Sequence, residues 1–235
     1  MLTNFNLFGF EHILALIIPI VIGTLFIVLA YFYPTKKRMI SLLFALTIIL
    51  IRGTRYGFDM NIGAFRIQDL LSLHVCHLDL ILLLICLIKP SEKLFIFTFL
   101  IGIPTALAVA LMPGTTHAAP GLLRAVFFIM SHIMLVMGSI YLLIVYHFKI
   151  TKKDIYFYYL YSLIGIVLIY IYNLITNSNF MYLMEGPKNT VLETLYRTFG
   201  PLWYIIILYG LLVFLLTLLY LIYNTINKLF YIGKS

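Results

Sequence analysis

The sequence has few charged residues, only two cysteines and a single tryptophan. Charged residues make up 10% of its 235 positions, whereas a soluble domain carries about 25%. It also has no long polar stretch, which excludes a separate soluble domain. Because 63% of the residues are hydrophobic, the chain is expected to be an all-α, polytopic membrane protein with a single domain over residues 1–235.

The two cysteines, Cys76 and Cys86, lie ten residues apart in one apolar segment. On a helix this spacing separates them by roughly 15 Å along the axis, which is too far for a disulfide. Cysteine content therefore gives no information about the redox compartment. No internal repeat is visible, and no basic segment precedes the first apolar run, so a cleavable signal peptide is not expected.

Apolar runs of about 20 residues are long enough to cross the hydrocarbon core of a membrane as helices. Short basic or turn-rich segments separate these runs. The first half of the third run is polar, so six spans with a re-entrant third segment are the alternative to seven. The predicted spans are 11–33, 39–56, 67–88, 94–112, 121–147, 155–175 and 200–226.

The positions of Lys and Arg predict that the N-terminus is outside and the C-terminus inside. In this orientation the inner connections hold ten of the 16 basic residues but only two acids, Glu92 and Asp154. The outer half holds basic and acidic residues in equal number. The formal net charge of +8 thus falls on one side, where it is explained by topology and attraction to anionic lipid. We expect membrane lipids as partners and no nucleic acid; the sequence leaves the oligomeric state open.

The third predicted span carries a polar turn with two imidazoles, a thiol and a carboxylate: His74, Cys76, His77 and Asp79. Such groups are costly in lipid and usually face the bundle interior or a water-filled cavity. This span is therefore expected to be central, with its polar turn in the outer half of the bilayer.

Polar and aromatic residues of other spans are expected at the same depth, where they would line a polar cavity. A thiol, a base and an orienting acid are the components of thiol catalysis. The predicted catalytic residues are Cys76 as nucleophile, His132 as general base and His74 as an oxyanion donor. The predicted substrate-binding residues are Arg52, Arg55, His77, Asp79, His12 and Trp203.

His132 is preferred over His77 as the base because neighbouring residues on a helix point about 100° apart. His77 is therefore not expected to activate Cys76 easily. For each single histidine, a hydrogen bond between helices is the simpler interpretation. For Cys86, a small apolar filler is the simpler interpretation.

Several segments together resemble the bacterial YwaF-type integral membrane proteins over nearly the whole chain. They are LSLHVCHLDL at 71–80, Ser131-His132, 179–184 before Gly186-Pro187-Lys188, 200–204 and the early Glu11-His12. The resemblance implies a multi-pass protein of the bacterial cytoplasmic membrane.

More distantly, the pattern is similar to the eukaryotic transmembrane-protein-164 type, regarded as a cysteine-dependent acyltransferase that moves acyl chains onto ether phospholipids. The resemblance implies that His132 is the histidine of that chemistry. The family cysteine directly precedes the histidine that matches His74, where this chain has Leu73. Cys76 lies one turn further along, roughly 4.5 Å deeper on a helix.

The first hypothesis is therefore a lipid acyltransferase or acyl-ester hydrolase of the outer leaflet, without a cofactor. A second is a metal-dependent membrane hydrolase, because His74 and His77 stand at i and i+3 and zinc favours such ligands. A third is a transporter or a lipid-binding or small-molecule-binding protein, since intramembrane His, Asp and Arg are equally expected there. Inverted repeats would favour a transporter.

Overall fold

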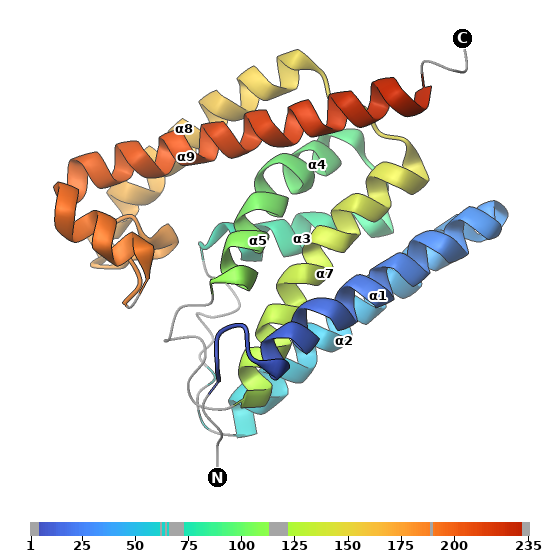
Figure 1. The fold of residues 1–235 in the computed structure, drawn as a ribbon, viewed down its shortest axis with the longest axis horizontal. Helices are drawn as coiled ribbons and strands as arrows, with labels where there is room; N and C mark the ends of the chain where they lie inside the picture. The colour runs from blue at the N-terminus through green and yellow to red at the C-terminus, as the bar shows by residue number, and fades with distance from the viewer. Residues whose placement is uncertain are drawn as a thin grey trace.

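The computed structural model describes residues 5–61, 63, 65, 73–112, 122–188 and 190–231, and within these ranges it contains helices and no strand (Figure 1). The all-α fold class is confirmed. In chain order the elements are α1 Phe10–Phe32, the 3₁₀ turn η1 Pro34–Lys36, α2 Lys37–Asn61, α3 Val75–Ile88, α4 Glu92–Phe97, the π-helical turn η3 Thr98–Gly102, α5 Ile103–Leu111, α7 Leu122–Tyr146, α8 Lys152–Thr176, the 3₁₀ turn η4 Phe180–Tyr182 and α9 Val191–Tyr231.

Within the described residues, six helical segments are long and apolar enough to cross a membrane. They match six of the seven predicted spans. The remaining one, the third span predicted at 67–88, is helical over the 14 residues of α3. These residues measure about 21 Å against a hydrocarbon core of about 30 Å. Residues 67–72 of this span lie outside the described residues. The helix α3 alone is therefore too short to cross the membrane.

The helix α2 is longer than predicted and continues to Asn61. The helix thus ends five residues beyond the predicted span 39–56, and Arg52 and Arg55 lie within it. The extra turns bring Asp59 one turn beyond Arg55, and an ion pair between these two side chains offsets the cost of continuing the helix past two arginines.

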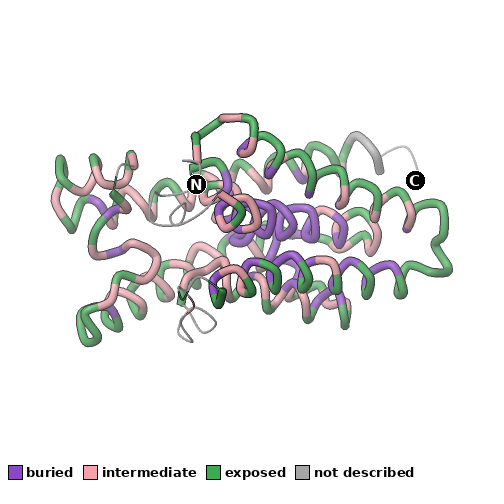
Figure 2. Tube along the Cα trace, turned by 90° about the horizontal axis from the view of Figure 1, so that it is seen from below, coloured by how far each residue is buried: buried purple, intermediate pink, exposed green. Residues whose placement is uncertain are grey.

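The centre of the bundle is α7, which packs against α1, α2 and α5 (Figure 2). Small residues allow the close approach of helices that membrane packing requires. A Cβ on Gly23 would lie 2.5 Å from Cβ of Met137, and one on Gly138 would lie 2.7 Å from Leu83. The core of the protein therefore lies around α7, and the surrounding helices turn their apolar outer faces to lipid.

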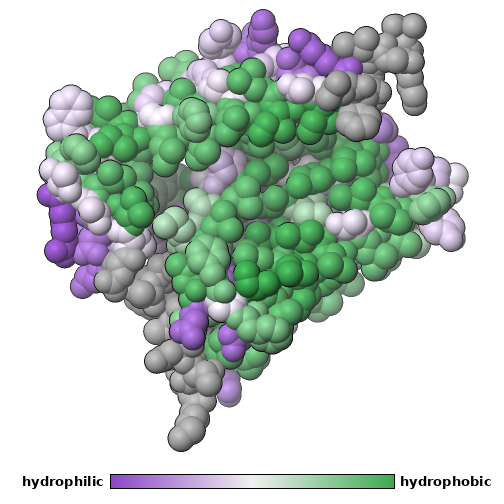
Figure 3. All heavy atoms as spheres, viewed as in Figure 1, coloured by the Kyte–Doolittle hydropathy of each residue, from purple (hydrophilic) through white to green (hydrophobic). Residues whose placement is uncertain are grey.

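The helices α8 and α9 form an outer pair that runs across the bundle (Figure 1). In each, only 6% of the most apolar window is buried inside the protein. At Gly200 the backbone has φ 73° and ψ 172°, and Pro201 follows, so α9 bends where the seventh span was predicted to start. Hydrophobic side chains cover most of the face in Figure 3, as expected for a surface in contact with lipid.

A buried carboxylate lies against the π-helical turn η3, at Gly102. The side chain of Asp79 is fully buried and, among the described residues, neither of its oxygens has a hydrogen-bond partner. A Cβ on Gly102 would collide with the carboxyl group of Asp79. This close approach explains why the position next to Asp79 holds a glycine.

The first prediction concerns this contact. Gly102→Ala is expected to lower the free energy of unfolding by about 1–3 kcal/mol, because the new methyl group overpacks a buried site. Thermal and denaturant unfolding of the purified protein in detergent would measure the change. In an Asp79→Ala background the same substitution is expected to cost little.

The matched control is Gly165→Ala in α8, where a Cβ meets nothing within 4 Å. This variant is expected to be neutral or stabilised by up to about 1 kcal/mol, because alanine favours a helix over glycine. If Gly102→Ala lowered the free energy of unfolding equally with and without Asp79, the proposed contact would be contradicted.

Candidate functional site

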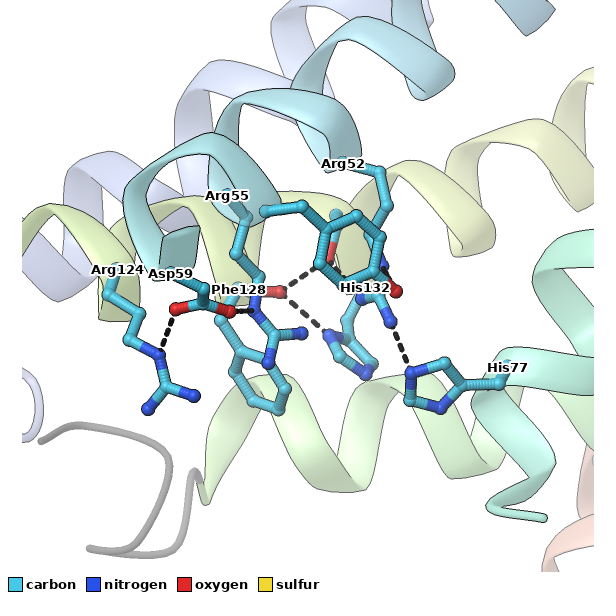
Figure 4. A network of polar contacts seen from close by, with 9 residues as sticks. Arg52, Arg55, Asp59, His77, Arg124, Phe128 and His132 are labelled. Atoms are coloured by element: carbon cyan, nitrogen blue, oxygen red, sulfur yellow. Dashed lines mark hydrogen bonds and ion pairs between the residues drawn. The ribbon is translucent and has the colours of Figure 1, made fainter. Parts of the chain in front are cut away.

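The guanidinium of Arg52, on α2, joins three helices at the centre of a polar cluster (Figure 4). It donates from Nη2 to Nε2 of His77 on α3 at 2.5 Å and from Nη1 to Oγ of Ser131 on α7 at 3.3 Å. Its Nε donates to the hydroxyl of Tyr56 at 3.1 Å. Arg52 is buried, so these bonds fix its position.

The bond from Arg52 determines which nitrogen of His77 carries a proton. Because a guanidinium can only donate, Nε2 of His77 is the acceptor, and the neutral ring carries its proton on Nδ1. Nδ1 lies 3.7 Å from Sγ of Cys76. The two side chains lie in contact at the start of α3, and in this tautomer His77 does not present a base to Cys76. His77 is placed to donate toward the sulfur.

Cys76 also lies in the first turn of α3, where the unpaired N–H groups of the helix favour negative charge. Its side chain is half-buried. Two geometric features stabilise a thiolate once one forms at Cys76: the start of the helix and the N–H of His77. Cys86 is buried and donates to the carbonyl of Ser91 at 3.3 Å, which agrees with a structural role.

His132, on α7, has the opposite tautomer from His77. Its Nδ1 lies 2.7 Å from the carbonyl oxygen of Phe128 and donates to it, so Nε2 holds a lone pair. Nε2 is buried and has no hydrogen-bond partner among the described residues. The ring lies next to Ser131, within the Arg52 cluster (Figure 4). A neutral imidazole with an unused acceptor nitrogen has the form that a general base requires.

His74 is the residue that precedes α3, and it contacts a loop between α8 and α9. Its Nδ1 accepts from the backbone N–H of Met181 at 3.2 Å, so the neutral ring carries its proton on Nε2. The rings of Phe180 and Tyr182 pack against it. Burial raises the pKa of the Tyr182 phenol, which keeps this neighbour of His74 uncharged.

The loop around η4 is held in a strained form. Met181 and Tyr182 have φ near 57°, in the left-handed region that non-glycine residues rarely adopt. Asn173 of α8 both donates to and accepts from the backbone of Phe180 at 2.9 Å, and the hydroxyl of Tyr204 donates to the carbonyl of Tyr182 at 2.9 Å. These bonds hold the N–H of Met181 against His74.

A second group of charges lies beside Arg52 on the same side of the bundle. The buried Asp59 carboxylate pairs with Arg55 at 3.6 Å and with Arg124 of α7 at 2.5 Å. The guanidinium of Arg55 also stacks over the ring of Phe128 at 4.7 Å. Arg52 lies beside this group (Figure 4), and guanidinium groups are suited to bind an anion.

Three of the predicted site residues have their contacts outside this cluster. Both ring nitrogens of His12 are used, by the N–H of Phe8 and the carbonyl of Ala110, each at 2.9 Å. His12 therefore connects α1 to α5. Trp203 is 60% exposed on α9, and Asp79 packs on Gly102. The structure thus brings together Cys76, His77, Arg52, Arg55 and His132, with His74 before the same helix.

The cluster lacks a set of metal ligands. Within the described residues, no group of three or more His, Cys, Asp or Glu side chains could hold a metal ion. His74 accepts from Met181 and His77 accepts from Arg52, so the i, i+3 pair does not converge on one point. His117 lies outside the described residues. The donor set does not fit the metal-hydrolase hypothesis.

Sequence reasoning missed the roles of Tyr56, Asp59, Arg124 and Met181. The spacing of Arg55 and Asp59 at i, i+4 was a signal for a helical ion pair, but their segment was predicted to end before it. Met181 contacts His74 through its backbone N–H, so the identity of its side chain gives no signal in the sequence. Contacts across 107 residues of sequence, such as that with His74, depend on the tertiary fold.

A multi-pass bundle of apolar helices with a buried Cys–His–Arg cluster defines an integral membrane protein with a polar intramembrane site. The sequence matches the model of the TMEM164 family over residues 7–223, and the chain belongs to this family. No curated protein and no solved structure matches it.

Proposed function

We propose that this protein is a lipid acyltransferase or acyl-ester hydrolase that acts in the outer leaflet through a thioester on Cys76. The observation that carries the proposal is the 3.7 Å contact between Sγ of Cys76 and Nδ1 of His77, together with the hydrogen bonds of three histidines. They give His77 a proton to donate toward Cys76, leave a lone pair on His132, and put a proton on Nε2 of His74.

The chemistry needs one nucleophile and one base. Nε2 of His132 takes the thiol proton as Sγ of Cys76 attacks the carbonyl carbon of an acyl ester. The C–O bond of that ester breaks, the acyl group stays on sulfur, and the proton of His132 passes to the leaving alkoxide. A second alcohol, such as the free hydroxyl of a lysophospholipid, then attacks the thioester; attack by water gives hydrolysis instead.

His77 and His74 are proposed to stabilise charge in these steps. The Nδ1–H of His77 supports the thiolate, and its ring is held by Arg52. The Nε2–H of His74 is assigned to the oxyanion that forms on the attacked carbonyl, a position where preorganised donors have a large effect.

The arginine group is proposed to bind the phosphate of the lipid. A guanidinium forms paired hydrogen bonds with phosphate oxygens, and Arg52 and Arg55 stand at i and i+3 on α2, so their side chains lie on neighbouring positions of one face. Membership of the TMEM164 family supports a phospholipid substrate. The outer orientation, the bacterial cytoplasmic membrane and the resemblance to YwaF-type proteins stay predictions.

Direct detection of the thioester tests the proposal. The full-length protein in lipid nanodiscs is supplied with phosphatidylcholine that carries an alkyne-tagged acyl chain, without an acceptor alcohol. We expect the tag on the peptide that contains Cys76, and we expect neutral hydroxylamine to release it. Mass spectrometry of the digested protein gives the position of the tag.

The other cysteine provides a matched control. Cys86→Ala is expected to keep the label, Cys76→Ala to lose it, and Cys76→Ser to carry at most an oxygen ester that neutral hydroxylamine does not release. Label retained in Cys76→Ala, or absent from the wild-type protein, would contradict the covalent route. Absence would instead favour a lipid-binding protein without catalysis.

A further inference from the structure

A cavity of about 1170 Å³ lies at the other end of α2 from Arg52 and Arg55. Its walls are the C-terminal ends of α1 and α7 and the last part of α9, with residues such as Ala30, Leu143 and Ile226. Lys37, in this cavity, and Arg52 are 15 residues apart on α2, which is about 22 Å along the helix. The cavity is therefore distinct from the Cys76 site.

The walls of the cavity are mostly apolar, and buried aromatic residues form its floor. Phe99 and Tyr223 are buried below it, and the Tyr223 hydroxyl accepts from the N–H of Ile150 at 3.2 Å. Ile222 and Ile226 on α9 are 47% and 48% exposed. The volume exceeds the roughly 300–1,000 Å³ of ordinary small-molecule sites, so the cavity has room for a larger apolar ligand.

The polar end of the cavity is basic. Lys37 and Lys149 both line it, and neither forms an ion pair within the part of the chain that the structure describes. The ammonium group of Lys37 lies over the ring of Tyr146, 5.2 Å from its centroid, which holds this cation at the cavity. The nearby acid Glu92 accepts from the backbone N–H of Lys149 at 3.5 Å.

We propose that this cavity binds an anionic phospholipid, with its acyl chains between α9 and the ends of α1 and α7 and its headgroup at Lys37 and Lys149. The middle of the face in Figure 3 is hydrophobic, and hydrophilic side chains lie toward its margins. This arrangement matches a lipid with chains in the bilayer and its phosphate at the surface. Basic pockets between membrane helices bind anionic headgroups in this way.

The charge of the cavity determines the type of lipid. Two cations without a paired acid favour a headgroup with a net negative charge over a zwitterionic headgroup with the same chains. The lysines lie on the side that carries the excess of basic residues, which is the predicted inner side and faces anionic lipid. The proposal does not depend on the chemistry of Cys76, because the two sites share no residue.

Native mass spectrometry of the full-length protein in detergent tests the proposal. Phosphatidylglycerol and phosphatidylcholine with identical chains are titrated separately, and the fraction of protein with one bound lipid is measured. We expect the wild-type protein to prefer phosphatidylglycerol about 25-fold. Lys37→Gln with Lys149→Gln is expected to reduce this preference about 25-fold, or about fivefold for each lysine, as for roughly 1 kcal/mol per cation.

Two further variants distinguish this site from a general effect of charge. Lys152→Gln with Lys153→Gln removes the same charge outside the cavity and is expected to keep the preference. Ile226→Trp fills the cavity from an exposed position on α9 and is expected to weaken binding of both lipids at least tenfold. The proposal would be overturned if both double lysine variants lost the preference for phosphatidylglycerol equally, or if the wild-type protein showed no preference. Unchanged lipid binding in Ile226→Trp would overturn it as well.

Discussion

Turnover of the Cys76→Ala variant is expected to fall by about 10⁴- to 10⁶-fold, the range found when an enzyme loses its nucleophile. The His132→Ala variant is expected to lose about 10²- to 10⁴-fold, because it lacks the group that accepts the thiol proton. The double variant is expected to be no slower than Cys76→Ala alone, since both residues serve one step. Transfer of a labelled acyl chain from phosphatidylcholine to a lysophospholipid in vesicles would measure all three.

This prediction separates shared chemistry from independent structural effects. Cys86→Ala serves as the control and is expected to keep full turnover, because the Cys86 thiol is buried and donates to the backbone carbonyl of Ser91 at the start of α4. Losses that multiply in the Cys76→Ala, His132→Ala double variant would show that the two residues do not act together. Each variant is compared at equal amounts of folded protein.

Substitution of Asp59 is expected to have the largest effect on stability. Asp59→Asn removes the buried carboxylate that neutralises Arg55 and Arg124, and the loss of one partner from a buried ion pair typically costs about 3–5 kcal/mol. Asp59 is fully buried, and the side chains of Arg55 and Arg124 are 7% and 12% exposed, so water cannot replace the lost acid. Unfolding of the purified protein by denaturant in detergent would measure the cost.

Two comparisons make the stability prediction specific. Arg124→Gln combined with Asp59→Asn is expected to recover part of the loss, because one of the uncompensated cations is removed. Glu11→Gln removes an acid that has no ion pair in the described part of the chain and is expected to cost less than about 0.5 kcal/mol. A cost of Asp59→Asn as small as that of Glu11→Gln would refute the argument.

Most of the fold could be predicted from the sequence, because lipid requires long apolar helices and tolerates little else. Six of the spans follow from runs of apolar residues alone. The end of the second span was predicted too early, because arginines mark the edge of the membrane unless a nearby acid compensates them. Asp59 neutralises Arg55 on its own helix and Arg124 on α7. Hydropathy does not detect these ion pairs.

The candidate site could be predicted in its composition but not in its geometry. The polar turn at 74–79 indicated the right segment, since polar groups in apolar surroundings stand out. His12 had the same signal, yet it bonds only to backbone groups of Phe8 and Ala110. The tautomers of His74, His77 and His132 are set by partners on other helices or by a backbone carbonyl, which no spacing rule predicts.

The weak attachment of the α8–α9 pair makes the site sensitive to bilayer thickness. The part of α9 after Gly200 runs to Tyr231 and is about 46 Å long at 1.5 Å per residue, so it must tilt to fit a hydrocarbon core of about 30 Å. The hydroxyl of Tyr204 on this helix holds the loop that contacts His74. A thinner or thicker membrane therefore changes the tilt of α9 and, through this loop, the position of the imidazole.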